Sequence, residues 1–417
     1  MAQLSDDCFA FGGDLLTVAS ALAQIQARVA PIVETEMVPL QAAAGRILAH
    51  DIIAAMNLPP HDNSAVDGYA VAHADLTTDR DTLMPVTGRA AAGHPLDRPM
   101  RRGESIRIFT GAPMPEGADT VMMQEDCAFA AGRVLIRPGI RRGANRRHAG
   151  EDVAAGEVAL PAGRWLRAPD LGLGAALGHR ELSVFRPLRV ALLSTGDEIR
   201  DPGAPLPQGA VYDANRFMLA ALLAGFGCVV TDFGIRPDRE AVLIDTLAAA
   251  SAEHDLIVTS GGVSTGEEDH VKSAVERLGT LHFWRLAIKP GRPVALGQVG
   301  GVPLIGLPGN PVAVIVTFLV LARPLIAKLA GASVSEPRLF PVRAGFGYRK
   351  KPGRREYLRA NLARTDGAAV AVKYPKDGAG ILSSIVRSDG LVILEEMVSE
   401  LTVGTMVDFL PFSEVIG

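Results

Sequence analysis

A chain of 417 residues is too long for one ordinary hydrophobic core and predicts three or four domains. Hydrophobic residues make up 48% of it, and no run reaches the roughly 18 uninterrupted apolar residues that a membrane span needs. The formal net charge of -4 gives no support for a nucleic-acid binder, and the N-terminal segment carries acids where a secretory signal has basic residues. We therefore expect a cytoplasmic protein without a membrane span, whose three scattered cysteines are reduced and structural.

The first part of the chain predicts helical and β-rich stretches in turn. Residues 17–29 have a helical pattern, and residues 42–55 form a second apolar stretch. A polar segment, residues 61–70, follows a pair of prolines, and a loop so polar between apolar stretches is often functional. From about residue 85 to residue 161, short strands with frequent Gly and Pro predict a small all-β unit.

From residue 188 onward the pattern changes to strands that alternate with helices. We expect strands at residues 190–193, 228–233, 256–259, 283–288, 294–298 and 304–307, and helices at residues 214–224, 239–252, 270–278 and from 310 onward. This alternation predicts an α/β unit with a doubly wound, mainly parallel sheet and helices on both faces. After residue 337 the chain returns to short strands, which indicates a separate small β-barrel or sandwich.

Three loops of the α/β region follow strands and are rich in glycine and hydroxyl groups: residues 194–198, 259–269 and 306–311. In open α/β sheets ligands bind at the carboxyl ends of the strands, where such loops meet. Gly261 and Gly262 let backbone N–H groups come close to an anion. Asn310 followed by Pro311 is a well-formed helix start, which favours phosphate. One such loop alone is as easily an ordinary turn, but three at strand ends favour a ligand site.

Carboxylates and basic side chains lie beside the same loops. Glu198, Asp238 and Asp269 each occupy a predicted strand-to-helix junction, where carboxylates can bind Mg²⁺ and bring it to phosphate oxygens. For Asp238 the alternative is helix capping. Lys289 and Arg292 lie on the turn after another strand and suit an oxyanion, although a solvated hairpin turn is the alternative.

Nine segments spread over nearly the whole chain carry a family resemblance. They are PPHDNSAVDGYAV (59–71), RIFTGAPMPEGADTV (107–121), GED (150–152), STGDEI (194–199), TSGGVSTGEEDHVK (259–272), FWRLAIKPGRP (283–293), GLPGNPVAV (306–314), GRREYLRA (353–360) and GILSSIVRSDGLVIL (380–394). Through them, in order, the chain resembles the molybdopterin molybdenumtransferases, called MoeA in bacteria, and the E domain of gephyrin. Four positions depart from the usual family pattern while keeping charge or general size: His61, Val66, Arg285 and Ala313.

The resemblance implies four domains in an elongated homodimer. They are a discontinuous N-terminal domain (1–50 and 149–182), an inserted β-rich domain (51–148), an α/β molybdopterin-binding domain (183–333) and a C-terminal β-barrel domain (334–417). In dimers of the family the Asp62 loop reaches the α/β cleft of the partner chain. The site is therefore expected to span the interface.

The resemblance also implies a reaction and its residues. The family's enzymes take adenylylated molybdopterin (molybdopterin-AMP) and molybdate, with Mg²⁺, insert molybdenum at the dithiolene and release AMP. The implied catalytic residues are Asp62, Glu198, Asp238 and Asp269, of which the last three are also the implied metal ligands. The residues implied to bind the pterin phosphate, the nucleotide and molybdate are Thr195, Gly196, Gly261, Gly262, Ser264, Lys289, Arg292, Pro308, Gly309, Asn310, Pro311, Arg355 and Ser383.

Three other functions remain open from the sequence. A molybdopterin adenylyltransferase uses the same α/β module, but as a short chain without residues 62–70 or a terminal β domain. A gephyrin-like scaffold would carry a further enzymatic domain and a long linker, and a nucleotide hydrolase would share only the α/β module. We also expect transient contact with a molybdopterin adenylyltransferase, which makes the adenylylated pterin.

Overall fold

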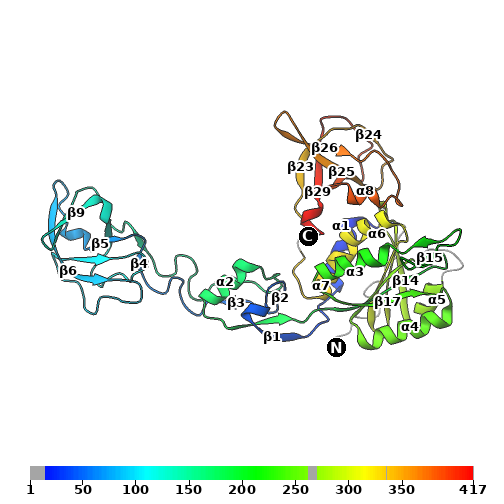
Figure 1. Cartoon of the computed structure of the whole chain (residues 1–417), viewed down its shortest axis with the longest axis horizontal. Coiled ribbons are helices and arrows are strands. Elements are labelled where there is room, and N and C mark those ends of the chain that lie inside the picture. Colours follow the sequence, from blue (N-terminus) through cyan, green and yellow to red (C-terminus); the bar gives the residue numbers. More distant parts are fainter. Residues whose placement is uncertain (1–14, 262–269, 335, 417) are drawn as a thin grey trace.

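The computed structural model describes residues 15–261, 270–334 and 336–416, and it shows an elongated chain. Figure 1 shows the β-rich inserted unit at one end, a small domain in the middle, and the α/β and C-terminal units together at the other end. The fold class predicted from the sequence is confirmed, with a central α/β unit, an inserted β unit and a barrel.

The inserted unit is a six-stranded sheet in the order β8-β5-β7-β6-β10-β9. Its strands are β5 (Gly68–Val71), β6 (Thr82–Ala90), β7 (Ser105–Ile108), β8 (Thr120–Met123), β9 (Cys127–Ala130) and β10 (Arg133–Ile136). A short pair, β4 (Asn63–Ser64) with β11 (Arg146–Arg147), brings the polar segment against two arginines that lie about 80 residues further along the chain. Two small apolar clusters, one around Tyr69 and one around Ile106, form its core.

The middle domain is built from segments before and after the inserted unit. β1 (Thr35–Pro39), β13 (Glu181–Phe185) and β2 (Ile47–Leu48) form an antiparallel sheet, and β3 (Ile52–Ile53) pairs with β12 (Val158–Leu160). The helix α2 (Ala168–Ala176) covers their apolar side, where Leu48, Leu166 and Val184 are buried. Because its strands come from both sides of the insertion, this domain is discontinuous in sequence.

The α/β unit has a six-stranded sheet in the order β17-β14-β18-β22-β21-β19. Its strands are β14 (Arg189–Thr195), β17 (Val229–Arg236), β18 (Leu256–Ser260), β19 (Gly279–Arg285), β21 (Pro293–Val299) and β22 (Val302–Leu307). The first four strands in that order are parallel, and β21 and β19 add an antiparallel edge. β18 and β22 are buried along their whole length, as expected of parallel strands that are covered on both faces.

Helices cover both faces of this sheet. α4 (Glu240–Glu253) and α5 (His270–Leu278) pack on one face, and α3 (Asn215–Gly225), α6 (Pro311–Thr317) and α7 (Arg323–Leu329) pack on the other. α1 (Val18–Arg28), which the Thr17 side chain caps, packs against α7. The prediction put residues 1–50 into the first domain, but α1 contributes to the α/β core instead.

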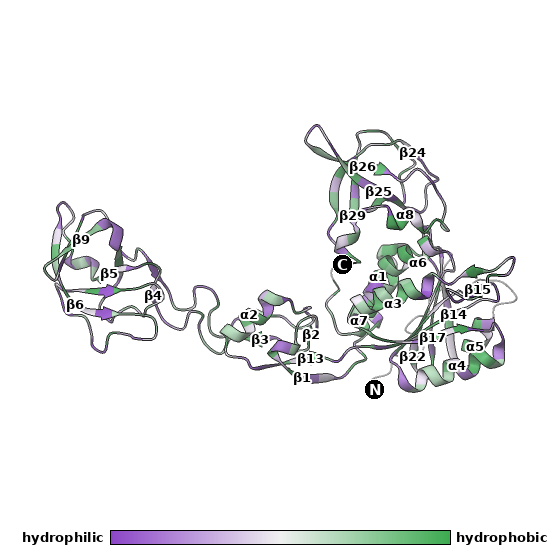
Figure 2. Cartoon of the chain, in the orientation of Figure 1, coloured by the Kyte–Doolittle hydropathy of each residue, from purple (hydrophilic) through white to green (hydrophobic). Residues whose placement is uncertain are grey.

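The segment from Pro311 to Leu329 is one helical run, with a π-helical turn (Phe318–Ala322) between α6 and α7. Among the described residues it is the one helix long and apolar enough to cross a membrane, and 83% of its most apolar window is buried inside the protein. Figure 2 shows it as an apolar helix between the sheet and the C-terminal unit. Its apolar character therefore fits a core helix.

The C-terminal unit is a closed barrel, which confirms the first of the two predicted alternatives. Its strands are β23 (Phe340–Ala344), β25 (Arg355–Thr365), β26 (Ala368–Lys373), β27 (Gly390–Leu394) and β29 (Met406–Pro411), and pairing of β25 with β27 closes the ring. β20 (Ile288–Lys289), from the α/β unit, pairs with β25 and joins the two units. The short helix α8 (Ser383–Val386) lies on the side of the barrel that faces the α/β unit.

Candidate functional site

A cleft of about 740 Å³ lies at the carboxyl ends of the parallel strands. Parallel strands end at one edge of a sheet, so loops far apart in the sequence meet there. Residues from all three predicted loops line the cleft: Thr195, Gly196, Glu198, Ser260, Gly261, Gly309, Asn310 and Pro311. The three loops therefore form one concave surface.

Two glycines shape the first two loops where they line the cleft. Gly261 has φ +87°, and a Cβ there would lie 2.7 Å from the carbonyl oxygen of Thr195, so the first two loops touch at this point. Gly196 has φ +145°, and a Cβ there would lie 2.7 Å from Glu198 Oε2. A side chain at Gly261 would strain the backbone and push the first two loops apart, whereas one at Gly196 would strain the backbone and displace the Glu198 carboxylate of its own loop.

Asn215, at the start of α3, ties the second loop to the third. Its Nδ2 donates hydrogen bonds to Ser260 Oγ at 2.9 Å and to the carbonyl oxygen of Gly309 at 2.7 Å. Asn215 carried no signal in the sequence beyond its place near the start of a predicted helix. Asp213 precedes the N-cap residue Ala214, and its Oδ1 accepts from the backbone N–H of Arg216, in the first turn of the helix, at 3.1 Å.

Glu198 and Asp238 both line the cleft, whereas Asp269, Gly262 and Ser264 lie outside the described residues. Helix α4 begins at Glu240 with Arg239 at its N-cap, so Asp238 is not the capping residue. Within the described ranges no three His, Cys, Asp or Glu side chains gather to hold a metal. Two carboxylates on one cleft nevertheless suit Mg²⁺, which often takes one or two protein ligands and completes its shell with water and substrate phosphates.

The third loop differs from the prediction in one detail. Asn310 takes the N-cap position and Pro311 the first helical position, but the Asn310 side chain makes no capping hydrogen bond. The N–H of Val312 donates to the carbonyl oxygen of Ala379 at 2.9 Å, so the C-terminal unit uses one of the N–H groups expected to bind phosphate. Gly380, in the same segment, lines the cleft, which the C-terminal unit thereby closes.

Lys289 is already paired in this structure. Its Nζ lies 3.2 Å from Oε2 of Glu356, whose side chain is 3% exposed and also accepts from the Tyr348 hydroxyl at 2.8 Å. Burial and the neighbouring Glu356 carboxylate raise the pKa of Tyr348. Neither Lys289 nor Arg292 is among the residues that line the cleft.

Arg355 and Ser383, predicted from the last unit, do not line the cleft either. The Arg355 guanidinium binds Glu395 at 2.5 Å and borders a separate cavity of about 140 Å³. Ser383 is the exposed first residue of α8.

Their neighbours Arg359 and Ser384 are both buried and lie together. Arg359 Nε donates to Ser384 Oγ at 3.0 Å, and its guanidinium also donates to the carbonyl oxygen of Gly378 at 3.3 Å. Burial lowers the pKa of Arg359. In the described part of the chain no carboxylate forms a direct ion pair with Arg359, which is therefore a buried cation bonded to neutral groups. Neither Arg359 nor Ser384 lines the cleft, but the acceptor Gly378 is two residues from Gly380, which does.

Asp62 lies in the inserted unit, far from this cleft in the same chain (Figure 1). Its carboxylate pairs with Arg146 and accepts from the backbone N–H of Ala149 at 2.8 Å. Burial alone would raise the pKa of Asp62, but these two hydrogen bonds hold it below its usual value. One chain therefore does not bring Asp62 to the α/β cleft.

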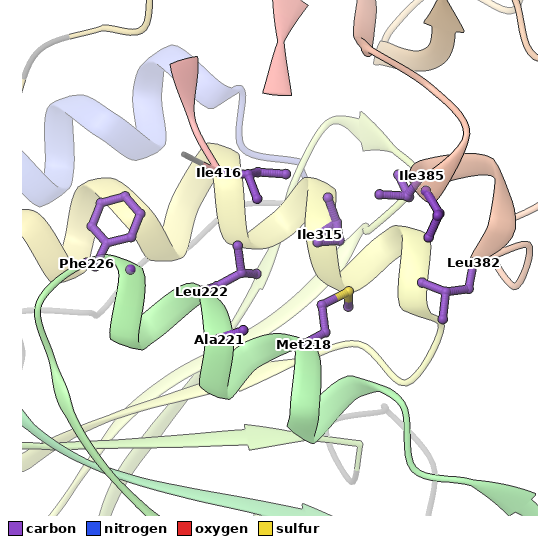
Figure 3. A pocket seen from close by; sticks show the side chains of 10 residues that line it. Met218, Ala221, Leu222, Phe226, Ile315, Leu382, Ile385 and Ile416 are labelled. Carbon is purple, nitrogen blue, oxygen red and sulfur yellow. The ribbon is translucent and has the colours of Figure 1, made fainter. Parts of the chain in front are cut away.

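An apolar groove of about 400 Å³ borders the cleft and shares Leu382 with it. Figure 3 shows Met218 and Leu222 of α3 facing Ile315 of α6 and Ile385 of α8 across it. The groove separates the α/β unit from the C-terminal unit and offers few polar groups. The polar chemistry is confined to the neighbouring cleft.

Three family models match the chain in order. They are the MoeA N-terminal region (domain I and II) over residues 16–178, the "Probable molybdopterin binding domain" over residues 191–328, and the MoeA C-terminal region (domain IV) over residues 341–412. A molybdopterin molybdenumtransferase of Haemophilus influenzae is 39% identical over 387 residues, covering 92% of this chain and 95% of that protein. The chain belongs to the molybdopterin molybdenumtransferase family. A relative from Nostoc is 35% identical over 373 residues, covering 87% of this chain and 85% of its own.

A solved structure of the family has the same architecture. The molybdopterin biosynthesis MoeA protein of Pyrococcus horikoshii superimposes with a TM-score of 0.81 at 28% identity, covering 95% of this chain and all of that one. The resemblance seen in the sequence is therefore confirmed over the whole length of the fold. The roles of individual residues remain predictions.

Proposed function

We propose that the chain is a transferase of molybdenum cofactor biosynthesis that inserts molybdate into molybdopterin. The observation that carries the proposal is the single cleft formed by three glycine-bearing loops beside Glu198 and Asp238. Such a cleft suits a phosphorylated ligand, because N–H groups can approach its anionic oxygens without hindrance from side chains. Relatives that match nearly the full length carry the name molybdopterin molybdenumtransferase.

The proposed substrate is adenylylated molybdopterin, with AMP as the leaving group. Thr195, Gly196 and Gly261 would hold its phosphates, together with Gly262, Ser264 and the Pro308–Pro311 turn. Glu198 and Asp238, with Asp269, would hold Mg²⁺, which supplies polarisation of the phosphoanhydride. The carboxylates alone would repel a phosphorylated ligand. A cation bound between the carboxylates and the phosphates would remove this repulsion.

Molybdate needs positive charge in this cleft because it is a dianion brought beside another anion. Arg359 and Ser384 do not line the cleft either, but Arg359 suits this role better than the predicted Arg355, because it donates to the carbonyl oxygen of Gly378, near Gly380 of the cleft, and forms no ion pair with a described carboxylate. Lys289 and Arg292 would add positive charge nearby. To bind the oxyanion, Lys289 would have to break its ion pair with Glu356. Preorganised charge of this kind lowers the energy of an anionic transition state.

The proposal extends to a cytoplasmic homodimer. A second copy would bring its Asp62 loop to this cleft, since the inserted unit of the same chain stands apart from it. The adenylylated substrate is reactive, so transient contact with the adenylyltransferase that makes it would limit its loss.

Two incubations test the reaction. The purified chain is given adenylylated molybdopterin, molybdate and Mg²⁺ in one, and molybdopterin with MgATP in the other. We expect AMP release and molybdenum cofactor only in the first, and adenylylation in the second alone would mean an adenylyltransferase. Asp238→Ala should lower AMP release by about 100-fold or more. Asp245→Ala, on the exposed face of α4, is the matched control and should keep normal activity.

A further inference from the structure

Arg216, in the first turn of α3, binds three aspartates at once. Its Nε donates to Asp213 at 3.0 Å, and its two terminal nitrogens reach Asp232 and Asp201. The Arg216 side chain is 6% exposed and that of Asp213 1%, whereas Asp201 and Asp232 are 61% and 46% exposed. One buried guanidinium thus holds acids from three different places in the chain.

Two of these acids belong to one wall of the cleft, residues 198–213. This wall segment contains the short parallel pair β15 (Ile199–Arg200) and β16 (Val211–Tyr212) and contributes Glu198 to the cleft. Asp201 and Asp213 stand near its two ends. The third acid, Asp232, belongs to β17, the edge strand of the sheet.

Little else fastens the wall segment to the protein. Apart from the bond that Asp213 Oδ1 accepts from the backbone N–H of Arg216, its other hydrogen bonds in the described part of the chain stay inside residues 196–214, for example Val211 N–H to the Glu198 carbonyl at 2.9 Å. Its apolar side chains do not anchor it either, since Leu206 is 48% exposed and Val211 is 55% exposed. Among the described residues, Arg216 is therefore the polar tether between this wall and the sheet.

Only an arginine suits this position. Its planar guanidinium presents five N–H donors in a fixed fork, so it can bind several carboxylates in different directions. A lysine ammonium is a compact charge that cannot reach three acids held apart. Loss of the guanidinium would also leave Asp213 as a buried unpaired carboxylate.

We propose that Arg216 is a positioning residue, which fixes residues 198–213 against the sheet and thereby holds Glu198 at the cleft. Its effect on ligand binding rests on the proposed function, but its effect on the wall segment does not. The two can therefore be measured separately on the same full-length protein.

The test compares Arg216→Met, Arg216→Lys and the double variant Arg216→Met with Asp213→Asn. Amide hydrogen exchange of residues 199–212 reports on the wall, and calorimetric titration with AMP and Mg²⁺ reports on the cleft. The double variant removes the buried unpaired carboxylate, while the amide oxygen of the asparagine introduced in its place can still accept from the backbone N–H of residue 216. Arg277→Met removes an exposed arginine of α5 that pairs with Glu240, and serves as the matched control.

We expect the double variant to melt like the wild type, yet to exchange roughly tenfold faster in residues 199–212 and to bind AMP about tenfold more weakly. Arg216→Lys should lie between the wild type and Arg216→Met, and Arg277→Met should match the wild type. Wild-type protection in the double variant would overturn the proposal, as would faster exchange with unchanged AMP affinity. If the wild type itself does not bind AMP, the proposed nucleotide chemistry fails, while the exchange data still decide whether Arg216 tethers the wall.

Discussion

Basic side chains around the cleft differ in whether an acid already neutralises them. Lys289 is paired with the buried Glu356, and Arg355 with Glu395. Arg359 donates instead to a hydroxyl and to backbone carbonyls, and the Asp377 carboxylate acts on it only from a distance, without a direct ion pair. A buried cation without a counter-ion is costly, and a bound oxyanion would remove that cost.

Two lysine substitutions test which of the two arginines, Arg359 or Arg355, binds molybdate. Arg359→Lys keeps the charge but loses the fork that bonds Ser384, so we expect the KM for molybdate to rise by roughly tenfold or more, with a smaller effect on kcat. Arg355→Lys should change the KM for molybdate little, because its acidic partners already neutralise it. Steady-state AMP release at varied molybdate measures both, and equal effects of the two substitutions would remove the distinction.

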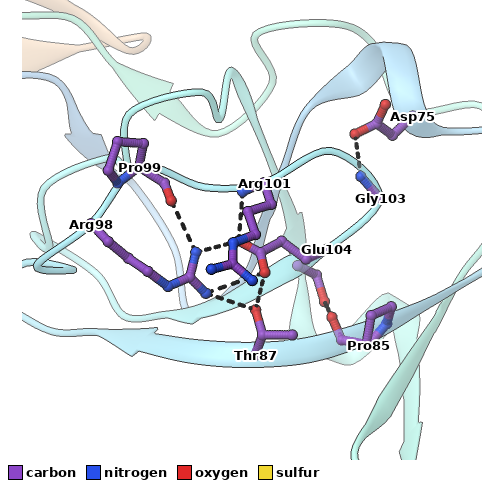
Figure 4. Close-up of polar contacts among 9 residues, drawn as sticks. Asp75, Pro85, Thr87, Arg98, Pro99, Arg101, Gly103 and Glu104 are labelled. Atoms are coloured by element: carbon purple, nitrogen blue, oxygen red, sulfur yellow. Dashed lines mark hydrogen bonds and ion pairs between the residues drawn. The ribbon is translucent and has the colours of Figure 1, made fainter.

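At the scale of elements, the Arg98–Glu104 ion pair fastens the long loop between β6 and β7 of the inserted unit. Glu104, at the start of β7, accepts from the Arg98 guanidinium, the Arg101 backbone N–H and the Thr87 hydroxyl of β6 (Figure 4). The hydrogen bond from Arg98 is the main cause that lowers the pKa of Glu104 from 4.5 to about 2. These contacts fasten residues 98–104 to the edge of β6.

This shifted pKa predicts how the inserted unit responds to acid. Because the folded-state pKa lies below the unfolded value, the stabilisation is complete above pH 4.5 and is lost as pH falls toward about 2. We expect a loss on the order of 2 kcal/mol across that window. Amide exchange of β6 and β7 between pH 6 and pH 3, corrected for intrinsic rates, measures it.

Glu104→Gln is the control for that pH dependence. It removes the titrating group and keeps the shape, so β6 and β7 should be less protected at pH 6 and should change less on acidification. A variant that responds to acid as strongly as the wild type would assign the effect to another carboxylate. Asp119 directly precedes β8 in the same unit and would then be the next candidate: burial alone would raise its pKa, but hydrogen bonds from the His73 N–H and the Arg142 side chain lower it.

At the scale of the whole molecule, the elongated shape separates the predicted acids. Glu198 and Asp238 line the cleft, while Asp62 lies in the inserted unit beyond the middle domain. No movement of a loop would join them within one chain. If all three serve one reaction, two copies must each supply part of the site.

Mixing two inactive variants tests this shared site. In the proposed shared site, one chain supplies Asp62 and the other supplies Asp238. A mixed dimer of Asp62→Ala and Asp238→Ala would therefore contain one intact site and one site that lacks both carboxylates. After the two variants are unfolded and refolded together, we expect about a quarter of wild-type AMP release, from random pairing of chains. Each variant refolded alone should stay inactive, and a mixture without activity would place the whole site in one chain.

Much of the fold could be predicted because its determinants are local. The alternation of buried strands and helices gave the mainly parallel sheet, and glycines at strand ends marked the loops that meet at the cleft. The match of nine segments in order predicted the family. Boundaries were less accurate: the strand expected at residues 228–233 is β17 (Val229–Arg236), and α1 joined the α/β core.

What tertiary structure alone decided is which side chains meet. Lys289 pairs with Glu356 of another unit, and Asn215 bonds to loops 45 and 94 residues away. Arg355 forms an ion pair with Glu395, whereas Arg359 forms none with a described carboxylate. Local sequence fixes backbone preferences and which positions are buried, because these depend on near neighbours. Pairings between distant polar groups depend on how whole elements pack, since a shift of one residue along a strand turns a side chain to the opposite face.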